Sequence, residues 1–255
     1  MVEVFVLGGG TPTPTEFRFG SAHALRIGDE VLMFDCGPAA PHKLVKAGLY
    51  PTQVDNLFFT HHHFDHAGSN ADFMQNAEVI AHKNARANIV RNDQTGAPRV
   101  VFSDETAVFL GGVEVQARHV GRGHTNGDAV IYFPDLGAVH TGDLFIWGQR
   151  LDGSALAPFW DFGNGGSAAE WPATLDKLLA LDFDTVIPGH GPILTKDEVR
   201  TFRRNLQTVL DRVQGQIEAG ATRDNIASRI DTNDLGWPLA PVRLQDVYDE
   251  LTAAR

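Results

Sequence analysis

The sequence predicts an α/β (α+β) fold, a four-layer αβ/βα sandwich in which two sheets lie face to face and helices cover both outer sides. Strand-rich and helix-bearing stretches occur in each half of the chain, so each half can supply one sheet and its helices. Histidines and aspartates follow several predicted strands, where their side chains can meet at one sheet edge. The length of 255 residues lies near the upper limit for one hydrophobic core, and we expect a single domain over residues 1–255.

Short apolar strands separated by turns dominate the first half of the chain. The predicted strands lie at residues 3–7, 22–27, 31–34 and 54–60. Gly28 and Asp29 predict the hairpin turn between the second and third of these strands. The pattern then predicts a short helix at residues 41–47, a helix-strand-helix stretch at residues 72–91, and two hairpins at residues 107–120 and 129–141.

Helices dominate the end of the chain. Residues 145–166 have no clear period and contain several glycines and aromatic residues, which predicts a long loop. A capping box that begins at Thr195 predicts the start of a long helix, whose apolar residues recur every three or four positions and require a sheet to pack against. The remaining predicted elements are a helix at residues 167–181, a strand at residues 185–188, and helices at residues 224–230 and 244–251.

The composition restricts the partners of the protein. Asp and Glu number 32 against 21 Lys and Arg, and the formal net charge of −11 disfavours nucleic acid as a partner. Cys36 is the only cysteine, so it can form neither an internal disulfide nor a cysteine-based zinc cluster. No apolar run approaches the ~20 residues of a membrane-spanning helix, and the first residues do not resemble a signal peptide. We expect a cytoplasmic protein with a small-molecule substrate and no membrane contact; a homodimer stays open.

The strongest chemical signal is the sequence THHHFDHAG, which follows a predicted buried strand. Imidazole and carboxylate groups are ligands that zinc prefers. His61 and His63 share one face of an extended backbone, and Asp65 and His66 follow as the chain turns. Because four ionisable side chains crowded into six positions need a partner that compensates their charge, the cluster predicts a metal site.

Three later segments supply further candidate ligands. His124, Asp143 and His190 each lie beside a glycine after a predicted strand or hairpin. Taken singly, such a histidine is more often a hydrogen-bonded loop residue, and such an aspartate is more often a turn residue or helix cap. Together with the cluster they give seven candidate ligands, whereas His62 is expected to point away from the site.

In this combination the motifs resemble those of the metallo-β-lactamase-fold hydrolase superfamily, whose members carry an HxHxDH motif, a later His, a bridging Asp or Cys, and a final His. The resemblance extends from the N terminus to about His190. It implies the metallo-β-lactamase fold with two divalent metal ions, zinc in the first place and manganese or iron as alternatives. By position it implies that the first metal is held by His61, His63 and His124, the second by Asp65, His66 and His190, and that the bridging ligand is Asp143.

Different parts of the chain are similar to different branches of this superfamily. The sequence GTPTP at residues 10–14, residues 21–23, and the sequence FDCG at residues 34–37 are similar to the start of ribonuclease Z and of arylsulfatase-like members. The sequence GHTNGD at residues 123–128 and its short spacing to Asp143 are similar to glyoxalase II and lactonase-like members. The acidic charge counts against transfer-RNA processing. Asp143 counts against β-lactamase activity as the main role, because true β-lactamases of this fold usually have Cys or Ser near this position.

The resemblance implies a metal-dependent hydrolase with a dinuclear centre. A metal-bridging hydroxide would attack an ester, thioester, lactone or related bond. Asp65 is the candidate catalytic residue that orients this hydroxide and moves its proton, with pure metal ligation as the alternative. Three other hypotheses stay open: a mononuclear iron oxidoreductase similar to persulfide dioxygenases, a phosphodiesterase similar to ribonuclease Z or an arylsulfatase-like hydrolase, and a non-catalytic binding protein.

The predicted loop at residues 145–166 directly follows Asp143, and its aromatic residues, Phe159 and Trp160 among them, are expected to line the substrate pocket. A contact between two copies of the chain is the alternative role of this loop.

Overall fold

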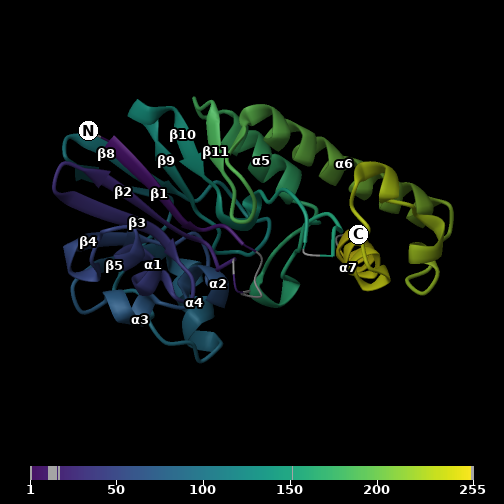
Figure 1. Cartoon of the computed structure of the whole chain (residues 1–255). Coiled ribbons are helices and arrows are strands. Elements are labelled where there is room, and N and C mark those ends of the chain that lie inside the picture. Colours follow the sequence, from purple (N-terminus) through teal and green to yellow (C-terminus); the bar gives the residue numbers. More distant parts are fainter. Residues whose placement is uncertain (1, 11–15, 17, 151, 254–255) are drawn as a thin grey trace.

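Two six-stranded sheets lie face to face in the computed structural model, and helices cover the outer side of each (Figure 1). The structure describes residues 2–10, 16, 18–150 and 152–253. Residues 11–14 of the GTPTP motif therefore lie outside the described residues, as does position 151 of the predicted loop. The four-layer sandwich expected from the sequence is confirmed.

The first sheet is built entirely from the first half of the chain. Its strands, in spatial order, are β1 (Val2–Gly8), β2 (Ala22–Ile27), β3 (Glu30–Cys36), β4 (Val54–Phe58), β5 (Glu78–His82) and β6 (Val100–Phe102). Strands β1, β2 and β3 are antiparallel, and β3 to β6 run parallel. Gly28 has a φ of +62° in the turn between β2 and β3, a conformation that glycine adopts without steric cost.

Four helices accompany this sheet: α1 (Ala40–Lys46), α2 (Phe64–Ala67), α3 (Asn70–Phe73) and α4 (Lys83–Arg91). Buried side chains from all four, Leu44, Ala67, Phe73 and Ile89 among them, join one hydrophobic cluster with residues of the sheet. This cluster forms the outer core of the first half.

The second sheet contains the later strands. In spatial order they are β12 (Leu194–Thr195), β11 (Thr185–Ile187), β10 (Ala138–His140), β9 (Val130–Phe133), β8 (Val113–Arg118) and β7 (Glu105–Leu110). Only the pair β10 and β11 is parallel among these. The covering helices are α5 (Trp171–Leu179), α6 (Lys196–Glu218) and α7 (Pro241–Ala253), which lie on one side of the molecule (Figure 1).

The core between the two sheets is apolar and closely packed. Phe34 and Phe58 of the first sheet cluster with Val115 and Ile131 of the second, and none of the four side chains is exposed. This inner core fixes the two sheets relative to each other, so the loops at one end of both sheets are held at fixed positions.

Most elements predicted from the sequence are confirmed, with two kinds of exception. Strands β6 and β12 were not predicted, because runs of three and two residues are too short to show a pattern. The helix predicted at residues 224–230 is wrong, since this segment forms only the 3-10 helix Ile226–Arg229. There the Ser228 hydroxyl donates a hydrogen bond to the Asn225 carbonyl, a local bond that competes with helix formation.

Helix α6 begins as its sequence predicts. The carboxylate of Glu198 accepts hydrogen bonds from both the backbone N–H and the hydroxyl of Thr195. The apolar stripe of the helix is buried against the second sheet. Among the helices of the described residues, none has both the length and the apolar character that crossing a membrane requires.

The hydrophobic cluster between the second sheet and its helices forms the outer core of the second half, and Phe202 connects α6 to it. Its ring centroid lies 4.9 Å from that of Trp237, 5.5 Å from Phe145 and 6.0 Å from Trp171, and its side chain is fully buried.

Phe202→Ala should therefore lower the free energy of unfolding by about 3–5 kcal/mol, because it leaves a cavity in a packed core. Urea denaturation measures this change. Arg204→Ala on the exposed side of α6 is the control, with an expected change within about 0.5 kcal/mol. Equal effects of the two substitutions would contradict this account of the core.

Candidate metal centre

The seven candidate ligands lie together at one end of the two sheets. His61 and His63 follow β4, and Asp65 and His66 lie in the single-turn helix α2. The other three are His124 in the loop between β8 and β9, Asp143 in the 3-10 helix Gly142–Leu144 after β10, and His190 after β11. All seven are buried except His63, which is half-buried.

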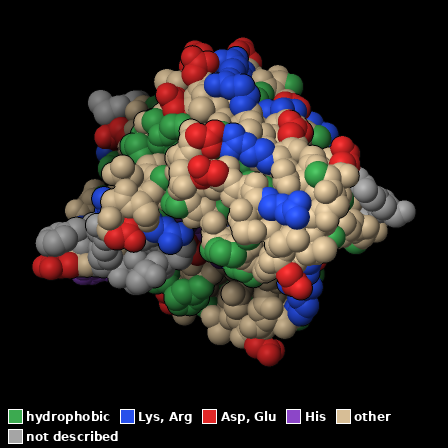
Figure 2. Space-filling model, turned by 90° about the vertical axis from the view of Figure 1, so that its right-hand side faces the viewer, with side chains coloured by type: hydrophobic (Ala, Val, Ile, Leu, Met, Phe, Trp, Pro, Cys, Tyr) green, Lys and Arg blue, Asp and Glu red, His purple; other side chains and the backbone are tan. Residues whose placement is uncertain are grey.

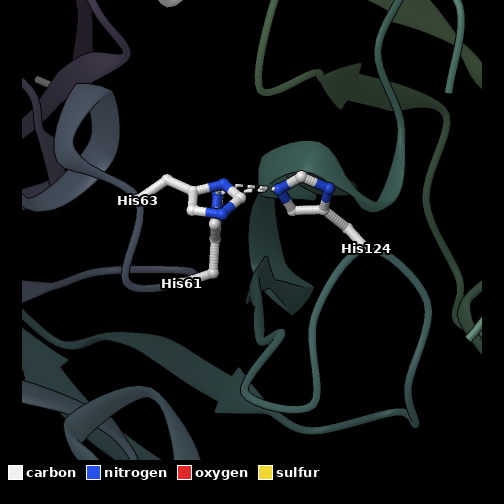
Figure 3. A group of neighbouring side chains, drawn as sticks. All are labelled: His61, His63 and His124. Carbon is white, nitrogen blue, oxygen red and sulfur yellow. Dashed lines mark hydrogen bonds between the residues drawn. The ribbon is translucent and has the colours of Figure 1, made fainter. Parts of the chain in front are cut away.

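Three histidines form a first group whose ring nitrogens point toward one another (Figure 3). His63 Nδ1 lies 3.2 Å from His61 Nε2 and 2.8 Å from His124 Nε2. The Nε2 atoms of His61 and His124 are 3.2 Å apart. A single ion could contact all three nitrogens.

A second group consists of Asp65, His66 and His190. The Nε2 atoms of His66 and His190 are 3.3 Å apart, and His190 Nε2 lies 3.1 Å from Asp65 Oδ2. Both groups take two residues from the segment after β4. His124 completes the first group, and His190 completes the second.

The carboxylate of Asp143 lies between the two groups. Its Oδ1 is 3.1 Å from His66 Nε2, and its Oδ2 is 3.3 Å from His190 Nε2 and 3.6 Å from His124 Nε2. Asp143 also forms a further group of potential ligands with His61 and His66. Asp143 is thus close to residues of both groups, as a bridging ligand would be.

Each of the five histidines has an acceptor at the nitrogen that points away from the centre. The acceptors are Thr60 Oγ1 for His61 (3.1 Å), Asp161 Oδ2 for His63 (2.9 Å), Asp35 Oδ2 for His66 (2.7 Å), the Phe159 carbonyl for His124 (2.5 Å) and the Gly10 carbonyl for His190. An outer N–H that donates to these acceptors leaves the inner nitrogen of a neutral ring with its lone pair. The lone pairs therefore converge on the centre.

Converging lone pairs fit a divalent metal ion that takes nitrogen and oxygen ligands. Lone pairs about 3 Å apart with no proton between them repel, so this arrangement needs a cation. Two carboxylate oxygens point to the same conclusion. Asp65 Oδ2 and Asp143 Oδ1 are buried, and among the described residues neither accepts a hydrogen bond of ordinary geometry.

The pKa of a histidine is shifted in opposite directions in the two groups. Burial, together with the neighbouring His63, lowers the pKa of His124 to about 4, which favours the neutral ring in the first group. In the second group burial opposes protonation of His190, but the carboxylates of Asp143 and Asp65 outweigh it and raise its pKa to about 9. A metal ion in the second group therefore competes with protons for the same nitrogens.

Asp35 is part of this site, although the sequence analysis assigned it no role. It is fully buried at the end of β3 and has a φ of +57°, which is uncommon for a residue other than glycine. Its carboxylate accepts hydrogen bonds from His66 Nδ1 (2.7 Å), His140 Nε2 (2.8 Å) and the Thr60 backbone N–H (2.7 Å). Burial opposes its ionisation, but His66 and His140 outweigh this effect and hold its pKa well below the ordinary value. A charged residue inside the apolar run VLMFDC was the available signal.

Glycines next to the ligands allow the close packing of the centre. A Cβ on Gly189 would lie 2.0 Å from Asp143 Oδ1. Gly142 has a φ of +51°, and a Cβ there would lie 2.3 Å from the hydroxyl oxygen of Thr60. These two positions therefore require glycine, which explains why two of the candidate ligands lie beside one in the sequence.

The loop at residues 145–166 supports the centre from outside. Asp161 and the Phe159 carbonyl hold His63 and His124, and the Trp147 backbone N–H donates to the His190 carbonyl at 2.9 Å. Phe159 is 37% exposed, and its ring centroid lies 5.6 Å from that of His124. The expectation that Trp160 lines the pocket is wrong, because this side chain is 1% exposed and belongs to the outer core.

His62 belongs to none of the groups of potential ligands that the seven candidate residues form among themselves. It is buried and lies with His63 and Asp161 in a separate group of potential ligands. Burial and the adjacent His63 lower the pKa of His62 to about 3.

The fold and the site together define a class of protein, a four-layer αβ/βα sandwich with a histidine and carboxylate centre at one end of its sheets. Residues 15–190 match the family model described as the metallo-beta-lactamase superfamily. The chain belongs to this superfamily, as its HxHxDH motif and the later ligands indicated.

Solved structures of the superfamily have the same fold. A metallo-beta-lactamase family protein from Thermus thermophilus aligns with 98% of this chain and 94% of its own, with a TM-score of 0.69 and 17% identity. A metallo-beta-lactamase from Pontibacter korlensis aligns with 74% of this chain and 87% of its own, with a TM-score of 0.62 and 22% identity.

Curated relatives cover the sequence less completely. The alpha subunit of 2,4-dinitroanisole O-demethylase from Nocardioides sp. (strain JS1661) is 25% identical over 75% of this chain. Ribonuclease Z from Pyrococcus furiosus is 41% identical over 26% of this chain. The matched parts make up 57% and 22% of those relatives, so this chain spans only a part of their length.

Asp161 is a residue through which the loop can act on metal binding. Asp161→Asn keeps the size of the side chain but replaces the charged carboxylate that faces His63 Nε2 with a neutral amide, so His63 loses the ionic partner that fixes its ring. We predict that metal affinity falls about 10- to 100-fold while the free energy of unfolding changes little, because loss of such a partner weakens the ligand it orients.

Asp152→Asn is the matched control, since Asp152 lies in the same loop and bonds only the backbone and hydroxyl of Ser154 among the described residues. Competition with a fluorescent zinc chelator measures the affinity of each variant. Equal metal affinity of the two variants would show that Asp161 has no role in metal binding.

Proposed function

We propose that this protein is a metal-dependent hydrolase with a dinuclear centre, zinc in the first instance, that acts on an ester, thioester, lactone or related bond. The observation that carries the proposal is the convergence of five inner histidine nitrogens and two buried carboxylates in two groups that share Asp143. Seven ligands exceed the four that one tetrahedral zinc ion accepts. Membership of a superfamily rich in metal-dependent hydrolases supports the same reaction class.

The ligand assignment follows the two groups. His61, His63 and His124 would hold the first metal, Asp65, His66 and His190 the second, and Asp143 both. When bound, the metals supply Lewis acidity and make water a better nucleophile near neutral pH. The chain itself fixes each imidazole through its outer N–H, and the burial of the ligands limits access of bulk water.

Asp65 is our candidate for proton transfer. Its Oδ2 is buried and lies 3.1 Å from His190 Nε2, and the side chain is 7% exposed. Burial opposes its ionisation, but His66 and His190 hold its pKa below the ordinary value. The carboxylate is therefore ionised at neutral pH and can accept a proton from the attacking water.

A small-molecule substrate fits the surface better than nucleic acid does. Figure 2 shows Lys and Arg side chains beside Asp and Glu on the face that carries α6 and α7. The ion pairs that involve these helices include Arg212 of α6 with Asp234 (2.6 Å) and Arg223 with Asp249 of α7 (2.7 Å). Paired charges of both signs offer little attraction to a phosphate backbone.

Cleavage of an aryl ether is a second candidate. The O-demethylase relative aligns with 75% of this chain, whereas the ribonuclease Z from Pyrococcus furiosus aligns with about a quarter. We therefore include 2,4-dinitroanisole as a substrate to be tested beside the acyl compounds.

The hydrolase proposal is tested by metal analysis and turnover of the same preparation. After reloading with zinc or manganese, elemental analysis should approach two ions per chain. His124→Ala and His190→Ala should each lose about one ion, while His42→Ala, an exposed histidine of α1, should retain both. A stoichiometry that stays at one after reloading would contradict the dinuclear centre.

Turnover is measured on p-nitrophenyl esters, thioesters, lactones, phosphodiesters, aryl sulfates, a cephalosporin and 2,4-dinitroanisole. We expect the acyl compounds to react fastest. Oxygen consumption with a persulfide substrate, in place of hydrolysis, would instead favour an iron oxidoreductase.

Substitution of Asp65 separates metal ligation from proton transfer. Asp65→Asn keeps the size and one oxygen of the side chain but removes the carboxylate that accepts a proton. We expect kcat to fall about 10²- to 10⁴-fold, the range that general acid and base groups supply. Metal content should fall less, because six other ligands remain.

The comparison variant is His66→Ala, which removes a candidate ligand but leaves the Asp65 carboxylate in place. Both are measured at saturating metal, as kcat against ions bound per chain. If both variants lose activity only in proportion to lost metal, Asp65 is a ligand and not the proton acceptor.

A further inference from the structure

A cleft of about 550 Å³ lies beside the candidate metal centre. Its volume is in the range of small-molecule sites. Its described lining consists of five glycines, two cationic side chains, two aromatic rings, Gln149 and a few aliphatic residues. The cleft lies between the end of β1, helix α1 and the loop at residues 145–166.

The wall of this cleft is also the support of His190. Gly10, which lines the cleft, accepts the hydrogen bond from His190 Nδ1 through its carbonyl. Gly191 follows His190 directly and donates its backbone N–H to the Gly9 carbonyl at 3.0 Å. Trp147 lines the cleft and binds the His190 carbonyl. The cleft therefore lies on the outer side of His190, with Gly10, Gly191 and Trp147 between it and the second group of candidate ligands.

The charge of the cleft is opposite to that of the chain. Arg18 and Lys43 line it, and no Asp or Glu is among its described lining residues, although the net charge of the chain is −11. Lys43 Nζ lies 3.9 Å from the centroid of the Phe19 ring, and Arg18 Nη1 donates to the Gln149 carbonyl at 3.3 Å. Phe19 and Gln149 also line the cleft, so both cationic groups are held at its wall.

We propose that this cleft binds the anionic end of the substrate, a carboxylate or phosphate group on a small organic molecule. Guanidinium and ammonium groups bind such anions. Leu156, Trp147 and Pro192 provide an apolar wall for the rest of the molecule. The inference rests on the proposed hydrolase, because it makes Arg18 and Lys43 specificity-determining residues for the reaction at the adjacent centre.

A pair of matched esters tests this specificity. The mono-4-nitrophenyl ester of glutaric acid carries a terminal carboxylate, and 4-nitrophenyl valerate has an acyl chain of equal length without one. The metal-loaded protein should show a higher kcat/KM for the anionic ester. In the double variant Arg18→Gln/Lys43→Gln this preference should fall about 5- to 30-fold, as expected for two partly exposed ion pairs, because kcat/KM falls more for the anionic ester than for the neutral ester.

Lys46→Gln is the control, because Lys46 lies on the same helix as Lys43 but does not line the cleft. It should keep the wild-type preference. The preference of the wild type should also weaken as salt concentration rises. An unchanged preference in the double variant would overturn the proposal.

Equilibrium binding separates this inference from the proposed reaction. Calorimetric titration of the metal-loaded protein with glutarate and with phenyl phosphate distinguishes the two anions without any turnover. Binding that is lost in the double variant but kept in Lys46→Gln supports the cleft even if no ester is hydrolysed, in which case only the hydrolase proposal fails. Binding of neither anion, or binding that the double variant retains, overturns the cleft as an anion site.

Discussion

The buried carboxylate of Asp35 is the interaction on which the centre depends most. It accepts hydrogen bonds from His66 and from Thr60, whose hydroxyl in turn faces His61 Nδ1. It also binds His140 on β10, so one carboxylate joins the end of the first sheet to the second sheet. Because the charge is fully buried, each of these partners is needed to offset its loss of hydration, and the geometry has little freedom.

The loop at residues 145–166 provides a second kind of support for the centre, which depends mainly on backbone groups. It holds three ligands through one side chain and two backbone groups, and two of those contacts need no particular side chain. The outer core fixes the loop through Phe145 and Trp160, which pack with residues of α5 and α6. The positions of the candidate ligands therefore depend in part on α6. This helix lies beyond residue 190, where the family match ends.

The sequence predicted the fold, and proposed candidate ligands, where the signal is local. Period-two patterns and apolar spacings of three and four identified most strands and helices, and the spacing of HHHFDH identified four candidate ligands in one segment. Contacts between distant segments left no such signal. Asp161 reaches His63 across 98 positions, and His140 reaches Asp35 across 105, so neither could be assigned from spacing. Trp160 was misplaced because a loop pattern does not show which aromatic residue faces the core.

Charge balance connects the centre to the cleft beside it. In the proposed dinuclear centre the seven candidate ligands, with neutral histidines, would set two negative charges against the four positive charges of two divalent ions. Asp35 and Asp161 add negative charge directly behind His66 and His63, which would stabilise such ions but reduce the positive potential that they present. An anionic substrate approaching a chain of net charge −11 therefore gains little from the centre alone. Arg18 and Lys43 supply this attraction without changing the charge at the ligands, which explains why cations lie in the cleft and not inside the centre.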